Sequence, residues 1–135
     1  MILVDTSAWV EFLRGTGSAT ASEVRALVGG DAEIATCDAI RMEVLAGARD
    51  RAHLADLRAL LARCVNLPLE PEDYEVAASL HRTCRQNGET VRKLVDCLIA
   101  ASAIRRDVVL LHLDADFDAI ARHSALRAHA AGGAP

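Results

Sequence analysis

Long apolar runs are missing from this sequence of 135 residues. No stretch approaches the roughly 18 residues that a membrane-spanning helix needs. The first residues, MILVDTSAWVEF, have no basic segment and carry an acid at position 5, whereas a secretory signal begins with positive charge. We therefore expect a cytoplasmic protein that makes no contact with a membrane.

Paired cysteines are missing too. The four cysteines are Cys37, Cys64, Cys84 and Cys97, and none forms a C-x-x-C pair. This spacing disfavours both a zinc site and a disulfide framework. We expect four small, buried, apolar side chains in a reducing compartment.

Positive charge is scarce: the net charge is −4 and Lys93 is the single lysine. A protein that coats nucleic acid is usually basic, so that class is disfavoured. One segment, HRTCRQNGETVRK, has a local excess of positive charge. Its basic residues are Arg82, Arg85, Arg92 and Lys93, against the single acid Glu89. Either a solvated surface or a phosphate-binding surface accounts for this segment.

What is present is an alternation of apolar strands and amphipathic helices in a chain that is 52% hydrophobic. This pattern predicts one α/β domain with three layers, in which helices cover a central, mostly parallel sheet. We expect the domain to span residues 1–128 and a frayed tail to follow at 129–135. Strands are expected at 1–4, 32–36, 65–69 and 108–113. Helices are expected at 8–15, 19–30, 39–48, 52–64, 71–88, 90–107 and 116–124.

Two acids follow apolar strands directly. Asp5 comes after MILV, and Asp114 comes after VVLLHL. Parallel sheets bind ligands beyond the carboxyl ends of their strands. If these two strands are neighbours, the two carboxylates meet at one edge of the sheet.

Two more acids stand in apolar surroundings, Asp96 in VRKLVDCLIAASAI and Glu43 in DAIRMEVLAG. A carboxylate in such a place is costly unless something pairs with it. Asp96 has a simple explanation if it pairs with Arg92 one helical turn earlier. Glu43 has one if it pairs with Arg41 or with a distant arginine.

A cluster of Asp5, Glu43, Asp96 and Asp114 would exceed what ion pairing explains. Two carboxylates about 4 Å apart repel by roughly 4 kcal/mol at an effective dielectric near 20. Such a cluster needs a cation, and oxygen ligands suit Mg²⁺ or Mn²⁺. These ions, singly or in pairs, promote phosphoryl transfer.

Four stretches carry a family resemblance: ILVDTSAWVEFLRG, IRMEVLAGA, VDCLIAASAI and LLHLDADFDAIA. In this order and in a chain of this size, they resemble the PIN-domain nucleases over nearly the whole length. The resemblance is greatest to the VapC-type ribonuclease toxins of bacterial toxin–antitoxin modules. It implies an endoribonuclease that depends on one or two Mg²⁺ or Mn²⁺ ions and cuts structured RNA such as tRNA. It also implies a homodimer that a cognate antitoxin inhibits by entering the active-site groove.

The resemblance assigns roles residue by residue. Asp5, Glu43, Asp96 and Asp114 match the family's acidic quartet, and Asp116 matches a further acid of the same site. Thr6 and Ser7 match a hydroxyl-bearing pair beside the first aspartate. His112 is a departure, because relatives usually place Thr or Ser there. Arg92, Lys93, Arg82 and Arg85 are candidate contacts for RNA phosphates.

Two other functions are compatible with parts of the pattern. LLHLDADFD resembles the D-x-D segment of haloacid-dehalogenase-type phosphatases, but that segment follows their first strand and needs a downstream lysine. The second alternative is a PIN-like module that binds metal and partner without cutting. Of the remaining polar residues, we expect Asp118 to be solvated and both His112 and His123 to be structural or on the surface. Trp9 could stack on a base, but we expect it in the core or a dimer interface.

Overall fold

A parallel sheet of five strands forms the centre of the computed structural model, which describes residues 1–132. The strand order is β3-β2-β1-β4-β5. The first and fourth strands are therefore neighbours, with Ile2 opposite Val109 and Val4 opposite Leu111. The strands are β1 (Ile2–Val4), β2 (Ile34–Cys37), β3 (Val65–Leu67), β4 (Val109–Leu111) and β5 (Ala128–His129).

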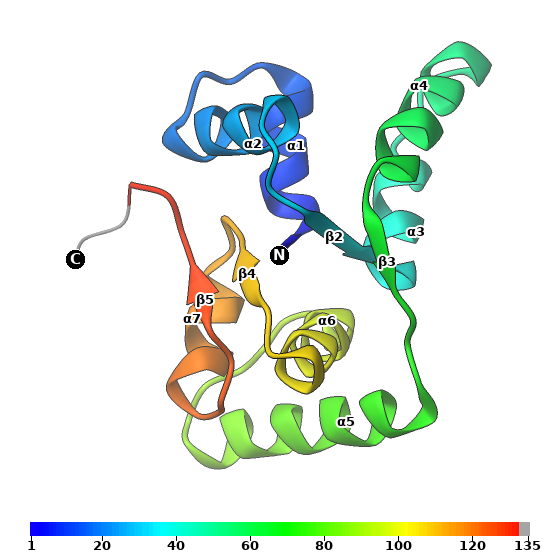
Figure 1. Cartoon of the computed structure of the whole chain (residues 1–135). Coiled ribbons are helices and arrows are strands. Elements are labelled where there is room, and N and C mark those ends of the chain that lie inside the picture. Colours follow the sequence, from blue (N-terminus) through cyan, green and yellow to red (C-terminus); the bar gives the residue numbers. More distant parts are fainter. Residues whose placement is uncertain (133–135) are drawn as a thin grey trace.

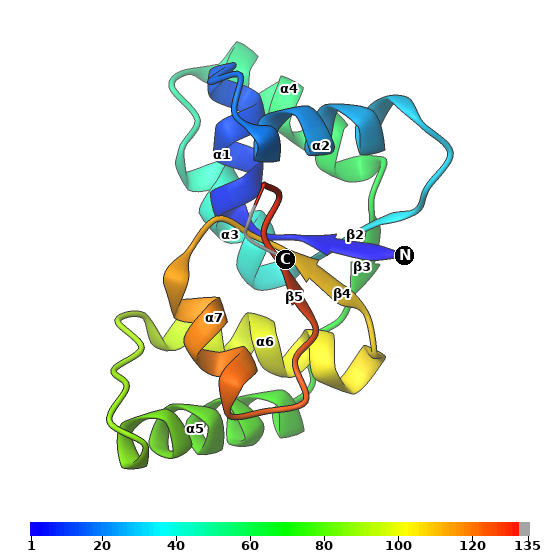
Figure 2. The same ribbon diagram turned by 90° about the vertical axis from the view of Figure 1, so that its left-hand side faces the viewer.

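Helices cover both faces of this sheet (Figures 1 and 2). One face carries α1 (Thr6–Arg14), α2 (Ala19–Gly29), α3 (Asp38–Ala46) and α4 (Arg51–Ala62). The other face carries α5 (Pro71–Gln86), α6 (Leu94–Arg106) and α7 (Ala115–Arg122). Right-handed crossovers require this split, because the chain moves one way along the sheet up to β3 and then returns to β4. The expected α/β class is confirmed.

The core explains why β1 and β4 are wholly apolar. Leu3 and Val4 of β1 and Leu110 and Leu111 of β4 are fully buried, as expected for strands covered on both faces. Trp9 is buried as well, so the expectation of a core tryptophan is confirmed. The expectation for the cysteines holds for three of them, whereas Cys64 is only half-buried.

Most boundaries predicted from the sequence differ from the structure by one or two residues, and two predictions need a larger correction. The helix expected at 90–107 begins only at Leu94, and the preceding residues form an extended approach to it. His129, assigned to a frayed tail, instead belongs to β5, and its carbonyl accepts a hydrogen bond from the His112 amide at 3.0 Å. Residues 133–135 of that expected tail lie outside the described residues.

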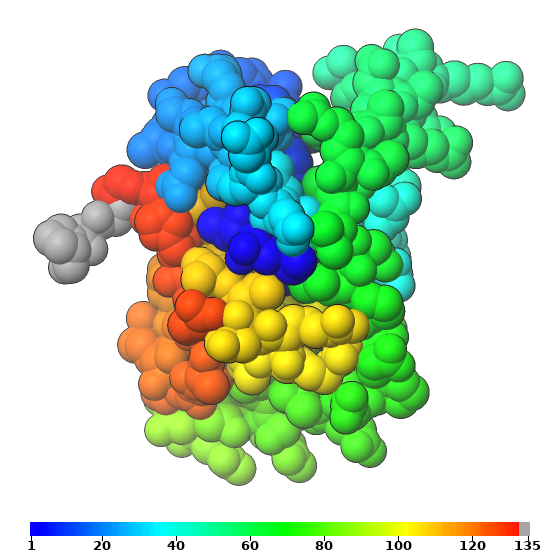
Figure 3. Space-filling model, in the orientation of Figure 1, coloured from blue at the N-terminus to red at the C-terminus, as the bar shows by residue number. Residues whose placement is uncertain are grey.

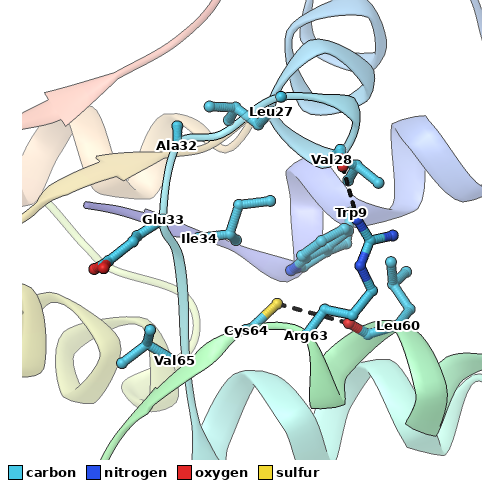
Figure 4. Close-up of a pocket in the computed structure, with 11 residues that line it drawn as sticks. Trp9, Leu27, Val28, Ala32, Glu33, Ile34, Leu60, Arg63, Cys64 and Val65 are labelled. Atoms are coloured by element: carbon cyan, nitrogen blue, oxygen red, sulfur yellow. Dashed lines mark hydrogen bonds between the residues drawn. The ribbon is translucent and has the colours of Figure 1, made fainter.

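The surface shows two features away from the carboxyl ends of the strands. Helix α4 projects beyond the rest of the molecule (Figure 3). A cavity of about 210 Å³ lies where β2 and β3 begin, lined by Trp9, Ile34, Arg63 and Val65 among others (Figure 4). Within residues 1–132, every helix is too short or too polar to cross a bilayer.

Candidate active site

The carboxyl ends of β1 and β4 bring Asp5 and Asp114 to the same edge of the sheet. Asp5 follows β1 and caps α1, while Asp114 follows β4 and caps α7. The Asp5 amide donates a hydrogen bond to the Leu111 carbonyl at 2.9 Å, which extends the β1–β4 pairing to the site itself. The predicted meeting of the two strand ends therefore occurs.

Ser7 fixes Asp5 in place. Its hydroxyl and amide both donate to Asp5 Oδ2, at 2.6 and 2.9 Å. The same hydroxyl accepts a hydrogen bond from the Leu113 amide at 2.9 Å, so one serine joins the start of α1 to the segment after β4. Asp5 is 3% exposed, and its other oxygen, Oδ1, is buried without a hydrogen-bond partner. Burial raises the pKa of this carboxyl, although the hydrogen bonds from Ser7 oppose the shift.

Asp96 is the most deeply placed acid of the site. It lies in the first turn of α6 and is 2% exposed, and its Oδ2 is buried without a partner. Burial raises its pKa to about 7, and the negative charge of Asp5 adds to the shift. The alternative of an Arg92–Asp96 ion pair is wrong, because Arg92 precedes the helix and pairs elsewhere.

Glu43 reaches the site from α3. Its Oε1 accepts a hydrogen bond from the Thr6 hydroxyl at 2.9 Å. Within residues 1–132 it forms no ion pair with an arginine, so the arginine-paired alternative does not hold.

Asp96, Asp114 and Asp116 form the tightest group of acids. Each places one carboxylate oxygen within 4.8 Å of the others. Asp114 Oδ1 accepts the Asp116 amide at 2.9 Å, as a helix cap does. The sequence favours Asp114 over Asp116 as the principal ligand, whereas this grouping places both within 4.8 Å of an Asp96 oxygen.

Arg92 supplies the positive charge nearest to this group. Its Nη2 lies 3.2 Å from Asp114 Oδ1, and its Nε lies 3.3 Å from Asp116 Oδ2. Its backbone amide also donates to Asp116 Oδ2, at 3.2 Å. These contacts join residues 22 and 24 positions apart. The sequence pointed to Arg92 as a phosphate contact or as a partner of Asp96, because no local pattern predicts such tertiary pairs.

The acids surround a cavity of about 310 Å³. Its lining includes Asp5, Glu43, Asp96 and Asp114, together with Thr6, Ser7 and Lys93. The buried oxygens of Asp5 and Asp96 that lack partners are what a hard divalent cation would satisfy. The residues present therefore fit such an ion, and the trio around Asp96 offers ligand atoms at a suitable separation.

Comparison with known proteins identifies the family. The family model described as the PIN domain matches residues 2–123. The chain belongs to the PIN-domain family. Ribonuclease VapC11 from Mycobacterium tuberculosis is 48% identical over 130 residues, which cover 95% of this chain and 97% of VapC11. That similarity places this PIN domain among the VapC-type ribonucleases.

Solved structures share the fold of this PIN domain. DNA-bound VapBC from Salmonella typhimurium matches with a TM-score of 0.74 and 16% identity, over 96% of each chain. VapC20 of Mycobacterium tuberculosis, a toxin that cleaves the sarcin–ricin loop, matches with a TM-score of 0.68 and 19% identity, over 94% of this chain and 99% of VapC20.

The predicted basic contacts of the PIN domain divide into two pairs. Arg92 and Lys93 lie at the site, the first on the acids and the second in the cavity lining. Arg82 and Arg85 are exposed on α5. Neither forms a hydrogen bond or ion pair with the acids in the part of the chain that the structure describes, so the structure does not bring this second pair into the site.

His112 packs beneath the site rather than in it. It is 1% exposed, its ring lies 5.3 Å from that of Phe117, and its Nδ1 accepts the Asp114 amide at 3.1 Å. The expected structural role is confirmed. The ring supports the turn that presents Asp114, because its Nδ1 accepts the Asp114 amide. In relatives with Thr or Ser at this position, a hydroxyl stands in place of the ring. Asp118 is half-exposed, and its Oδ1 lies 3.5 Å from His112 Nε2.

Proposed function

We propose that this PIN domain is a cytoplasmic endoribonuclease dependent on Mg²⁺ or Mn²⁺, and the toxin of a toxin–antitoxin pair. The observation that carries the proposal is the convergence of four acids on one cavity, with buried carboxylate oxygens of Asp5 and Asp96 left without partners. The membership of the chain among VapC-type ribonucleases supports the same activity.

The proposed ligands of one or two ions are Asp5, Asp96, Asp114 and Asp116, with Glu43 at the rim. A bound ion would lower the pKa of a water molecule and offset the charge of the scissile phosphate. Ser7 and Thr6 hold Asp5 and Glu43 in fixed orientations through their hydroxyl groups. Such orientation matters because a small displacement of a catalytic group costs much of the rate.

The substrate is proposed to be structured RNA, with tRNA as the first candidate. Lys93 in the cavity lining and Arg92 beside it would contact phosphates next to the cleaved bond. Arg82 and Arg85 would act only on a substrate that extends along α5. The relative VapC20 cleaves the sarcin–ricin loop, which is a ribosomal element, so ribosomal RNA belongs in the same test.

The inhibitor is proposed to be a cognate antitoxin. A groove of about 510 Å³ runs between α1 and the α3–α4 pair. Its lining includes apolar Val10, Val44 and Leu57, and it continues to Thr6 and Glu43 at the active site. A helix or extended segment lying there would reach the acids and block them. VapBC proteins are a family of toxin–antitoxin systems, and the Salmonella structure with this fold is a VapBC assembly, which supports an antitoxin as the partner.

The assembly is proposed to be a homodimer. Tyr74 and Leu94 are 56% and 59% exposed and flank an apolar groove between α5 and α6. Large exposed apolar side chains gathered on one face are typical of an interaction surface.

The test is cleavage of a total RNA pool by purified protein, in Mg²⁺ and in EDTA, beside the Asp96→Asn variant. We expect discrete fragments only with metal and native Asp96, and a loss of at least about a thousandfold in the variant. The variant should stay folded, since the substitution removes a buried charge. Asp107→Asn is the matched control, because Asp107 is exposed at the far end of α6.

Sequencing of the fragment ends then identifies the substrate. Fragments from tRNA would support tRNA as the substrate. Fragments from ribosomal RNA alone would show that ribosomal RNA is the substrate instead. An active Asp96→Asn variant would contradict the metal site. Folded protein that binds metal but cuts no RNA would instead favour a metal- and partner-binding module.

A further inference from the structure

The Arg92 guanidinium lies against the acidic trio while most of its side chain is exposed to solvent. It contacts Asp114 and Asp116, two of the three acids whose oxygens lie within 4.8 Å of one another. These are two of the carboxylates that the proposed function gives to a divalent ion. One cation already neutralises part of the charge that the ion would neutralise.

The backbone and the side chain of Arg92 are held very differently. Val91, its neighbour, is 3% exposed, and the Arg92 amide donates to Asp116 Oδ2. Glu89 anchors the same segment through an ion pair with Arg122 and a hydrogen bond with the His123 ring. The Arg92 side chain, in contrast, is 70% exposed, while Asp114 and Asp116 are only 13% and 10% exposed. The side chain can therefore leave the acids without disturbing the segment that carries it.

The strength of this attachment is modest. Solvent around the exposed guanidinium weakens its ion pairs, and the Nη2–Asp114 and Nε–Asp116 contacts lie at the long end of hydrogen-bonding distance. A divalent ion that binds several carboxylates outcompetes it.

We propose that Arg92 is a built-in counter-ion, which a divalent metal displaces from Asp114 and Asp116. In the metal-free protein it offsets the repulsion within the trio and keeps both acids in position. When the metal binds, the guanidinium is released at the rim of the site, where it becomes available for a substrate phosphate. This rests on the proposed metal site, and it assigns Arg92 two successive partners, first the acids and then the RNA.

Metal binding without RNA tests the displacement directly. Mn²⁺ is titrated by calorimetry into wild type, Arg92→Gln and Arg92→Lys. Loss of this competing pair should tighten Mn²⁺ binding by Arg92→Gln by up to about fivefold. Arg92→Lys should lie between the two, because it keeps the charge and loses the two-pronged contact.

Arg106→Gln is the matched control. It removes the same charge from the exposed last turn of α6, about 15 Å along the helix from Asp96 by helix geometry. Its Mn²⁺ affinity should equal that of wild type.

A second measurement follows the side chain itself. The Nε–H signal of Arg92, assigned by its loss in Arg92→Gln, should move toward the position of a free arginine as Mg²⁺ is added to the wild type. An unmoved signal, or equal or weaker Mn²⁺ binding by Arg92→Gln, would overturn the counter-ion role while leaving the proposed nuclease intact. Wild type that binds no metal would overturn the metal-dependent function and this inference together.

Discussion

Folding and metal binding favour opposite charge states of a single residue, Asp96. Its carboxyl is buried in the first turn of α6, beside Asp5 and near Asp114 and Glu43. Burial and these like charges both disfavour ionisation, and together they raise its pKa to about 7. A metal ligand must be ionised. The fold therefore holds Asp96 in a state that costs stability until a cation arrives.

This conflict predicts how the stability of the metal-free protein depends on pH. Below the ordinary aspartate pKa of about 4, Asp96 is protonated in both the folded and the unfolded chain and costs nothing. Between about 4 and about 7 the unfolded chain ionises while the folded chain keeps the proton, so the free energy of unfolding falls. Above about 7 the cost is complete and constant. Relative to Asp96→Asn, wild type should lose roughly 2 to 4 kcal/mol across this window.

Urea denaturation in EDTA at a series of pH values measures this difference. His112 is buried and its pKa is lowered by that burial, so it costs stability as the pH falls below about 6.5. Both proteins retain His112, and subtraction removes its contribution. A difference between wild type and variant that does not change with pH would contradict the prediction, because it would show that Asp96 has the same pKa in the folded and the unfolded chain.

At the scale of elements, the sequence predicts the features that depend on local patterns. Apolar runs that end in acids locate β1 and β4, and the topology rule for parallel sheets places Asp5 and Asp114 together. The start of α6 at Leu94 could not be predicted from local patterns. Lys93 precedes α6 without a side-chain cap, and residues 90–93 contain no Gly or Pro to mark a helix boundary. Their extended path depends instead on tertiary contacts, among them that of the Arg92 amide with Asp116.

β5 also lies beyond local patterns. Its two residues, Ala128 and His129, form no apolar run. They are held by pairing with β4, and His129 Nε2 also lies 3.0 Å from the Glu23 carboxylate of α2. β5 thus covers the edge of the sheet beside β4, the strand that leads to Asp114. It becomes ordered only by pairing with the folded β4.

Truncation measures what β5 contributes. A chain that ends at Leu126 should be about 2 kcal/mol less stable than one that ends at Gly132, because the Leu110 and His112 amides lose their acceptors on residues 127 and 129. The exposed edge of β4 should also promote aggregation. Chemical denaturation and light scattering of the two truncated proteins give these values. Equal stability of the two truncated proteins would mean that β5 contributes nothing to the stability of the sheet.

At the scale of the whole molecule, the two faces of the sheet are suited to different partners. The face with α1, α3 and α4 carries the groove that leads to the acids. The opposite face carries the apolar groove between α5 and α6. A dimer built on the second face would leave both inhibitor grooves open, since these lie on the first face. Neither arrangement needs a basic surface, which is consistent with a net charge of −4.

The proposed dimer makes the last prediction. Leu94→Glu places a charge on an apolar side chain that is 59% exposed beside the α5–α6 groove. Burial of that charge in an interface would be costly, so the variant should sediment as a monomer of 14.4 kDa and the wild type at twice that mass. Leu13→Glu is the control, because Leu13 is 40% exposed on α1, across the sheet, and should leave the dimer intact. If Leu94→Glu stays dimeric and Leu13→Glu dissociates, the interface lies on the α1 face and competes with the inhibitor groove.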